Sequence, residues 1–266
     1  MSVTLSAAKQ ARLVPAVQAK GGRIIAGGTL IVADLNYGAD SVALITLDRL
    51  GLDKIAVKGG KVTLGAMVTM AAVARDRRLK FLHPVADSIG GPAVRAMATI
   101  GGNLFAPSPY GDMAAAFLAL DAEISFHDGK ATRKLPIETF LAQRRKLQKH
   151  CVVSISFAAP SAGTFHYVKV VRRKPVSASV VTIAAVIPQK AGKIKGARIA
   201  LGAMAANAIR ARKAEAALEG RKLGDDIIAA AAKLIAAEAS PADDAYATAW
   251  YRREIAPVHF ARLLAA

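Results

Sequence analysis

Two pairs of adjacent glycines constrain this chain most, because each stands beside an apolar segment long enough for a strand or a helix. One lies in "AGGT" at 26–29, after the strand-like "RII", and the other in "TIGGN" at 99–103, ahead of an apolar run at 113–120. Glycine lacks a Cβ and reaches positive φ, so successive N–H groups can converge on an anion. From the residues alone, the two glycine segments have two interpretations. They are either ordinary turns or a pair of loops that clamp the phosphates of one dinucleotide. Neither matches the G-x-G-x-x-G fingerprint.

Length and hydropathy predict a globular protein. The chain has 266 residues, of which 53% are hydrophobic, enough for one large domain or two to three small ones. No stretch approaches the roughly 18 consecutive apolar residues of a membrane helix. The first residues, "MSVTLSAAKQ", lack the basic start and apolar core of a secretory signal. We therefore expect a soluble, cytoplasmic protein with no membrane span.

The charge balance raises the question of a nucleic-acid partner. The chain carries 37 Lys and Arg against 19 Asp and Glu, a net charge of +18, and a basic surface attracts phosphates. Aromatic residues are only 5% and do not alternate with the basic clusters "RRKLQK" (144–149) and "VKVVRRK" (168–174), so a base-stacking surface is not expected. We favour a solvated basic surface, or one that docks an acidic partner protein.

Cysteine and histidine usage predicts no metal in this chain. Cys151 is the only cysteine, which excludes an internal disulfide and an iron–sulfur cluster or Cys-rich zinc site held by this chain alone. It stands in the apolar "HCVVSISF", where we expect a small buried hydrophobic side chain. The five histidines show no metal-ligand spacing.

The first 160 residues predict two lobes. In residues 1–54 we expect a helix at 6–20 and strands at 23–25 and 42–50, and a helix between strands is typical of a small parallel sheet. Residues 55–160 predict an antiparallel α+β lobe. Its expected elements are a hairpin turning at Gly59-Gly60, a helix at 69–77, a helix after Asp112 with that acid as N-cap, a hairpin turning at Asp128-Gly129 and the Cys151 strand.

A loop-like segment, "APSAG" at 159–163, predicts a domain boundary, so that 161–266 form a second domain. Three strand-like stretches follow, "TFHYVKVV", "SASVVTIAAVI" and "KIKGARIALGAM". We expect helices at 210–219, at 225–237 with Asp225 as N-cap, and at 243–264. The prediction is a three-stranded sheet with three helices.

Several segments together resemble a known family. "AGGT", "TIGGNLFAPSPYGDMAAAFLALDA", "ARIALGAMAANAIRARKAEAALEG" (197–220) and "AYATAWYRREIAPVHFARLLAA" (245–266) are similar to the FAD-binding (medium) subunit of molybdenum hydroxylases. That family includes the medium subunit of aerobic carbon monoxide dehydrogenase and the flavin domain of xanthine dehydrogenase. The resemblance implies an α+β fold with a two-lobed FAD-binding domain of the PCMH type at 1–160 and a C-terminal flavoprotein domain at 161–266.

The resemblance also implies which residues contact FAD. Both glycine segments would hold the diphosphate, and the acid of "S-P-x-G-D" at 108–112 would lie on the adenosine side, accepting from ribose hydroxyls. An aliphatic residue, Val152 or Val153, would pack beside the flavin or the adenine, and Lys169 of "HYVK" would lie near the flavin ring; the alternative for Lys169 is a basic surface residue on an edge strand. The implied cofactor-binding residues are Ile25, Ala26, Gly27, Gly28, Thr29, Leu30, Thr99, Ile100, Gly101, Gly102, Asn103, Ser108, Asp112, Val152, Val153 and Lys169.

The chain departs from the family pattern after the first glycine pair. Relatives usually carry Asp where this chain has Leu30, and "IVADLNYGADS" at 31–41 replaces a segment rich in Arg and Lys. These changes leave the two glycine segments intact. They alter the polar contacts expected around the flavin ring.

The resemblance implies an electron-transfer subunit with no catalytic acid, base or nucleophile of its own. A large subunit would hold the molybdopterin cofactor and the substrate, a small subunit would hold two [2Fe–2S] clusters, and the assembly would be a dimer of such heterotrimers. This chain would pass electrons to an external acceptor. Two alternatives stay open: a stand-alone FAD oxidoreductase, such as a cell-wall sugar reductase or an aryl-alcohol oxidase, and a basic nucleic-acid-binding or scaffold protein.

Overall fold

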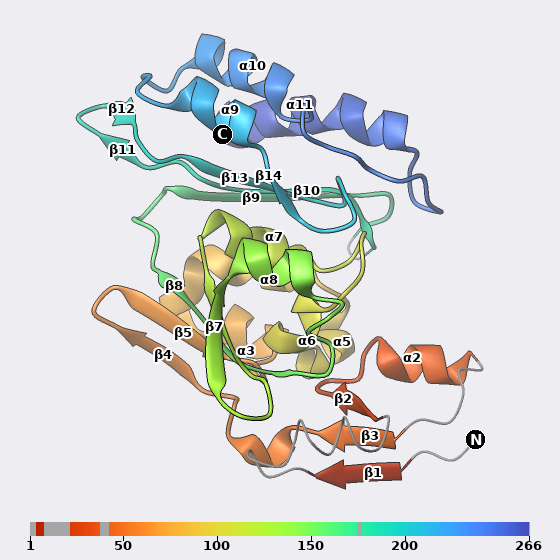
Figure 1. Cartoon of the computed structure of the whole chain (residues 1–266). Coiled ribbons are helices and arrows are strands. Elements are labelled where there is room, and N and C mark those ends of the chain that lie inside the picture. Colours follow the sequence, from red (N-terminus) through yellow and green to blue (C-terminus); the bar gives the residue numbers. More distant parts are fainter. Residues whose placement is uncertain (1–3, 8–21, 38–42, 175–176, 266) are drawn as a thin grey trace.

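The computed structural model describes the chain apart from residues 1–3, 8–21, 38–42, 175–176 and 266. Three sheets stack with helices between and above them (Figure 1). The first lobe, at one end of the molecule, is a parallel sheet in the order β1-β3-β2. Its elements are β1 (Thr4–Ala7), β2 (Arg23–Ile25), α2 (Ile31–Asn36), β3 (Ala43–Thr46) and the 3-10 turn η2 (Asp48–Leu50).

The predicted parallel sheet of the first lobe is confirmed, but its helices differ from expectation. Residues 6–7 of the expected helix at 6–20 belong to β1, and the rest of that helix lies outside the described residues. The helix between β2 and β3 is α2, which the sequence analysis missed; its fifth residue, Leu35, packs into the small core with Ile25 and Leu44. The strand expected at 42–50 ends at Thr46, because Asp48–Leu50 turn into η2.

The second lobe is an antiparallel sheet in the order β4-β5-β8-β6-β7 with helices packed on it. Both predicted hairpins are confirmed. The strands are β4 (Ile55–Lys58), β5 (Lys61–Gly65), β6 (Glu123–His127), β7 (Thr132–Pro136) and β8 (Cys151–Ala158). The helices are α3 (Met70–Arg75), η3 (Arg77–Leu82), α4 (His83–Asp87), α5 (Pro92–Met97), α6 (Ile100–Leu104), α7 (Asp112–Ala119) and α8 (Ile137–Gln143).

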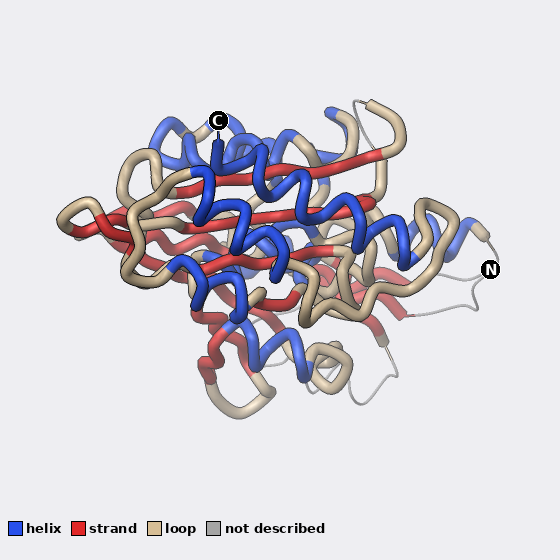
Figure 2. Tube along the Cα trace, turned by 90° about the horizontal axis from the view of Figure 1, so that it is seen from above, coloured by secondary structure: helices blue, strands red, loops and turns tan. Residues whose placement is uncertain are grey.

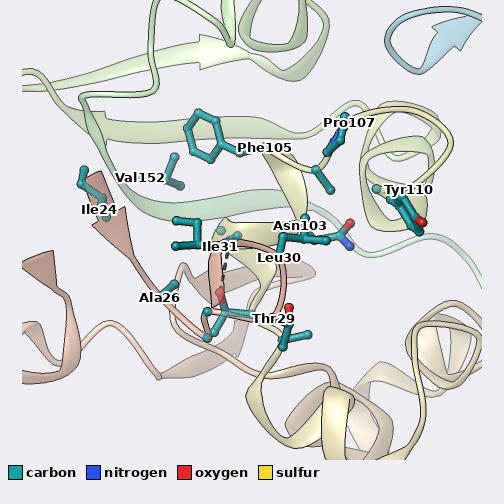
Figure 3. A pocket seen from close by; sticks show the side chains of 18 of the residues that line it. Ile24, Ala26, Thr29, Leu30, Ile31, Asn103, Phe105, Pro107, Tyr110 and Val152 are labelled. Atoms are coloured by element: carbon teal, nitrogen blue, oxygen red, sulfur yellow. Dashed lines mark hydrogen bonds between the residues drawn. The ribbon is translucent and has the colours of Figure 1, made fainter. Parts of the chain in front are cut away.

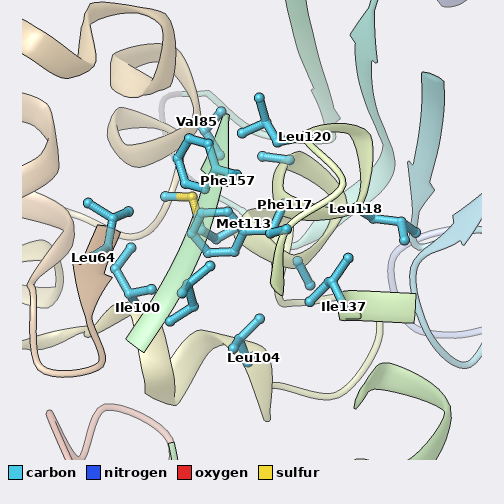
Figure 4. Close-up of a cluster of buried hydrophobic side chains, with 14 of the residues drawn as sticks. Leu64, Val85, Ile100, Leu104, Met113, Phe117, Leu118, Leu120, Ile137 and Phe157 are labelled. Carbon is cyan, nitrogen blue, oxygen red and sulfur yellow. The ribbon is translucent and has the colours of Figure 1, made fainter. Parts of the chain in front are cut away.

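Helix α7 is the centre of the second lobe, because every one of its residues is buried. Met113 and Phe117 meet Leu64 of β5, Ile100 of α6 and Phe157 of β8 in one core (Figure 4). A helix that is apolar all round must be covered on all sides. The second lobe covers one side of α7, and the C-terminal sheet covers the other.

The C-terminal sheet is antiparallel in the order β14-β13-β10-β9. Strand β10 is buried along its whole length, since α7 packs on one face of the sheet and three helices on the other (Figures 1 and 2). The strands are β9 (Phe165–Val171), β10 (Ser179–Val186), β13 (Arg198–Gly202) and β14 (Ile209–Arg210), with a small hairpin of β11 (Gln189–Lys190) and β12 (Lys193–Ile194). The helices are α9 (Arg212–Leu218), α10 (Asp225–Leu234) and α11 (Ala249–Ala265).

The structure confirms the first two predicted strands and the three helices of this region, but the third predicted stretch divides into β12 and β13, and the sheet gains a fourth strand, β14. Two predicted N-caps were wrong by one position. The N-cap of α7 is Gly111, at φ 87°, and Asp112 is the first helical residue; likewise the N-cap of α10 is Gly224, and Asp225 is its first residue. Helix α11 begins at Ala249 instead of Asp243, because the side chain of Asp244 accepts hydrogen bonds from the N–H groups of Tyr246 and Ala247 and holds a turn there. No helix in the described part of the chain has both the length and the apolarity to cross a membrane.

The buried position predicted for Cys151 is confirmed: the residue is 3% exposed and packs with Ile45, Leu47 and Leu52. Burial raises the pKa of its thiol to about 12, so the reactive thiolate is absent at pH 8. We expect iodoacetamide at pH 8 to leave the native protein unlabelled and to label the guanidinium-unfolded protein stoichiometrically, as measured by mass spectrometry. Fast labelling of the native protein would contradict this burial.

Candidate functional site

A cavity of about 800 Å³ lies where the two lobes and the C-terminal sheet meet. The loop after β2 and the start of α2 form one wall, and the segment from α6 to α7 forms the opposite one (Figure 3). Arg144 and residues 148–150 before β8, Lys169 of β9, and residues 177–178 before β10 complete the lining. Both glycine segments therefore face one cavity from two lobes, as the clamp interpretation requires.

The first glycine segment combines a close backbone approach with open N–H groups. A Cβ on Gly27 would lie 2.5 Å from the carbonyl carbon of Met97 and still closer to its oxygen, so only glycine lets this loop touch the end of α5. Gly28 has φ 72°, which glycine adopts without strain. The N–H groups of Gly27, Gly28 and Thr29 have no acceptor among the described residues. They are available to a ligand in the cavity.

The second glycine segment is the first turn of α6, and this corrects the expectation of an open loop. The Thr99 side chain caps the helix by accepting from the Gly102 N–H at 3.1 Å. The N–H groups of Ile100 and Gly101 bond to the carbonyls of Val68 and Ala66 at 2.9 and 2.8 Å. These amides are already paired inside the chain, so this segment offers the cavity the side-chain-free surface of Gly102 and the polar side chain of Asn103.

Asn103 connects the second glycine segment to α7. Its Oδ1 accepts from the Met113 N–H at 3.1 Å and so takes the capping role that was expected of Asp112. An amide whose oxygen is used in this way keeps its NH₂ group as a donor. The side chain lies between Leu30 and Tyr110 in Figure 3, so this donor belongs to the lining of the cavity.

Asp112 and Lys169 form a buried ion pair on the cavity wall. The Lys169 Nζ lies 2.7 Å from Asp112 Oδ2 and donates to the Ser88 carbonyl at 2.9 Å. Asp112 Oδ1 accepts from the hydroxyls of Ser179 and Thr182 at 2.5 and 2.6 Å. We call these five residues the Asp112 network; it joins α7 to β9 and β10.

The Asp112 network changes the roles expected from the resemblance. The side chains of Asp112 and Lys169 are only 6% and 7% exposed, so Lys169 is not a surface residue. The two charged groups pair with each other, so each has a role inside the chain besides the cofactor contact that the resemblance implies. Tyr167 lies beside this network, with its hydroxyl 2.9 Å from the Ser88 hydroxyl. Burial, and to a lesser extent the charge of Asp112, raises the pKa of Tyr167 well above its usual value.

The basic run before β8 faces the cavity, which composition alone did not indicate. Arg144 donates to the carbonyls of Ala106 and Ala206 at 2.6 and 3.2 Å and so ties the α6–α7 segment to the C-terminal sheet. Burial lowers the pKa of Arg144, although a guanidinium stays charged at neutral pH. Gln148, Lys149 and His150 lie in the same wall. Part of the predicted solvated basic surface is thus cavity lining.

Most of the residues expected from the sequence come together around the cavity. Those in its lining are Ala26, Gly27, Gly28, Thr29, Leu30, Thr99, Gly101, Gly102, Asn103, Asp112, Val152 and Lys169. Ile25, Ile100, Ser108 and Val153 are not in the lining. Ile25, Ile100 and Val153 pack into hydrophobic cores instead, and Ser108 is exposed.

Sequence reasoning missed a second set of lining residues. Successive side chains of a strand point to opposite faces, so Ile24 lines the cavity where Ile25 faces the core (Figure 3). The alternation of side chains along this strand was the sequence signal that could have identified Ile24 as a lining residue. The other missed residues include Leu47, Val94, Phe105, Pro107, Tyr110, Arg144 and His150.

Two family models together match most of the chain. The model described as the FAD binding domain in molybdopterin dehydrogenase matches residues 3–159. The model described as the CO dehydrogenase flavoprotein C-terminal domain matches residues 166–266.

Individual relatives agree with the family models. The chain is 27% identical to the glyceraldehyde dehydrogenase medium chain of Sulfolobus acidocaldarius, over 89% of this chain and 87% of that protein. It is 26% identical to a putative xanthine dehydrogenase FAD-binding subunit of Escherichia coli, over 82% and 79%. Among solved structures it resembles carbon monoxide dehydrogenase from Hydrogenophaga pseudoflava, with a TM-score of 0.92, 26% identity and coverage of 100% of this chain and 97% of the other.

Proposed function

Because the chain belongs to the family of FAD-binding domains of molybdopterin dehydrogenases, we propose that it binds FAD in the cavity and relays electrons from a partner's iron–sulfur clusters to an external acceptor. Residues 1–160 form the FAD-binding domain in this proposal, and residues 161–266 form the flavoprotein C-terminal domain. The observation that carries it is the meeting of two glycine segments from two lobes at one cavity.

The cavity lining fits an elongated anion with flat rings at its ends. The open N–H groups of Gly27, Gly28 and Thr29 are suited to a diphosphate, and Arg144 and Lys149 supply positive charge in the same cavity. Apolar side chains of Ile24, Phe105 and Val152 lie to one side of the glycine segments in Figure 3, where a ring can pack. The donor set and the shape therefore agree with FAD.

Bound FAD supplies the redox chemistry, and this chain's residues bind and orient it. The first glycine segment donates hydrogen bonds from its backbone, and Asn103 adds its side-chain NH₂ group. The Asp112 network holds the C-terminal sheet against α7, which closes the cavity on that side. A wall on that side keeps water from the part of the ligand that it covers and strengthens the electrostatic influence of nearby charges.

The names of the relatives support partner subunits for this chain. Medium chains such as those of glyceraldehyde dehydrogenase and carbon monoxide dehydrogenase are named as one chain among several. We infer a large subunit with the molybdopterin cofactor and a small subunit with two [2Fe–2S] clusters, assembled as a dimer of heterotrimers. Substrate hydroxylation then takes place on another polypeptide, and this chain acts in the cytoplasm.

The test compares the full chain alone with the chain in its complex. The FAD-loaded chain alone should oxidise no substrate, and the complex lacking FAD should still reduce its clusters with substrate while failing to reduce the external acceptor. Substrate oxidation by the chain alone would favour a stand-alone oxidoreductase. A colourless protein that binds duplex DNA in a salt-sensitive way would favour the nucleic-acid alternative.

Replacing Gly102 with valine tests the site directly. Gly102 is exposed, and a Cβ there would meet only the Thr99 hydroxyl, at 3.1 Å. We expect the Gly102→Val variant to fold but to bind FAD about tenfold more weakly or worse, because the side chain occupies space beside the diphosphate. Isothermal titration with FAD measures this. Gly91→Val is the matched control, since Gly91 is outside the lining and has open space around it; equal affinity in both variants would refute the assignment.

A further inference from the structure

Tyr110 is a large aromatic side chain left open at the cavity. It lies between Pro109 and Gly111 in the segment that connects α6 to α7, and it is 43% exposed. It belongs to the lining, on the side where Asn103 and Leu30 lie, away from Val152 and Ile24 (Figure 3). An exposed aromatic ring inside a ligand-sized cavity offers a flat apolar face to a ligand.

Tyr110 is held from the C-terminal domain. Its hydroxyl lies 2.8 Å from the hydroxyl of Tyr246, and the two rings meet edge to face, with centroids 6.3 Å apart and planes at 81°. The hydrogen bond to Tyr246 raises the pKa of Tyr110 to about 12. The hydroxyl therefore keeps its proton, and the bond persists, throughout the neutral pH range.

The loop that carries Tyr246 is itself anchored by a buried arginine. Arg252 of α11 is 1% exposed and donates to both carboxylate oxygens of Asp244, at 3.0 and 2.8 Å. It also donates to the carbonyls of Ala242, Ala247 and Val180, at 2.5, 3.1 and 2.9 Å. Asp244 in turn accepts from the Tyr246 N–H at 2.8 Å. A side chain with this many buried bonds fixes the loop in one conformation.

We propose that Tyr110 packs its ring against a planar ring of the bound FAD and that Tyr246 is a positioning residue that fixes Tyr110 from the other domain. This rests on the proposed FAD function. Binding a ligand costs conformational entropy when it immobilises a free side chain. This cost is lower for Tyr110, because Tyr246 already holds its ring in place before FAD binds. The C-terminal domain thereby contributes to cofactor affinity through a residue that does not line the cavity itself.

Four variants of the full chain test the proposal by titration with FAD. Tyr110→Leu removes the ring and should weaken binding about tenfold. Tyr110→Phe and Tyr246→Phe each remove the same hydroxyl contact and should each weaken it about threefold, while the double Phe variant should be no weaker than either single one. Tyr37→Phe is the control, because Tyr37 is 93% exposed and outside the lining.

Two further measurements identify the ring that Tyr110 meets. If it is the isoalloxazine, bound-flavin fluorescence rises in Tyr110→Leu while the affinity for ADP is unchanged; if it is the adenine, the affinity for ADP falls and the fluorescence stays constant. Either result supports the contact. Wild-type FAD affinity in Tyr110→Leu would overturn this inference and leave the proposed function intact. The same holds if the loss in the double Phe variant is the sum of the losses in the two single variants. A wild-type chain that binds no FAD would overturn the proposed function as well.

Discussion

Replacing Asp112 with alanine is expected to destabilise the folded chain by about 3 to 5 kcal/mol. The variant removes the counter-ion of Lys169, whose side chain is 7% exposed and whose one other hydrogen-bond partner among the described residues is the Ser88 carbonyl. It also removes the acceptor that the hydroxyls of Ser179 and Thr182 share. A buried charge without its counter-ion costs far more than the pair itself contributes. Urea unfolding followed by circular dichroism measures the loss.

The matched control removes both charges together. Asp112→Leu with Lys169→Met should be less destabilised than Asp112→Ala alone, because no uncompensated charge remains. The family resemblance makes a different prediction, in which Asp112 binds the ribose and its loss costs FAD affinity. If Asp112→Ala has near wild-type stability and strongly reduced FAD affinity, the result would favour the ribose role. It would contradict the view that Asp112 mainly stabilises the fold through the Asp112 network.

Replacing Gly27 with alanine is expected to abolish stable FAD binding, with a loss of about a hundredfold or more in affinity, equivalent to about 2.7 kcal/mol. The added Cβ would overlap the carbonyl group of Met97 and lie 3.2 Å from the Ala98 nitrogen. All three atoms are backbone, so no side chain can rotate away. The loop must move off the end of α5, and the open N–H groups of Gly27, Gly28 and Thr29 move with it. FAD titration and the flavin absorbance of the purified protein report the loss.

Gly102→Ala is the control for Gly27→Ala, since its Cβ meets one side-chain oxygen at 3.1 Å and no backbone atom. It should keep the fold and retain most of its FAD affinity, because a methyl group is smaller than the valine side chain tested above. Equal and mild effects in the two alanine variants would show that the Gly27 contact with α5 does not position the loop.

Local patterns predicted the hairpins well because their turn chemistry is contained in a few neighbouring residues. Gly59-Gly60 and Asp128-Gly129 turn the chain where expected, and the apolar run around Cys151 is a strand as predicted. Short helices were harder. The six-residue α2 and the five-residue α6 contain Gly or follow it, and their helical form depends on tertiary contacts and caps that no local pattern displays.

The sequence by itself determined the α+β character and the two glycine segments as the candidate cofactor site, because turn residues and glycine pairs are local properties, and it indicated the family through the resemblance of several segments. Tertiary structure alone decided what those residues do. It bonds the amides of Ile100 and Gly101 to the carbonyls of Val68 and Ala66, pairs Asp112 with Lys169 of β9, turns Arg144 into the cavity and joins Tyr110 to Tyr246. Each of these contacts links residues from different elements, and which elements meet is set by the packing of buried α7 between two sheets.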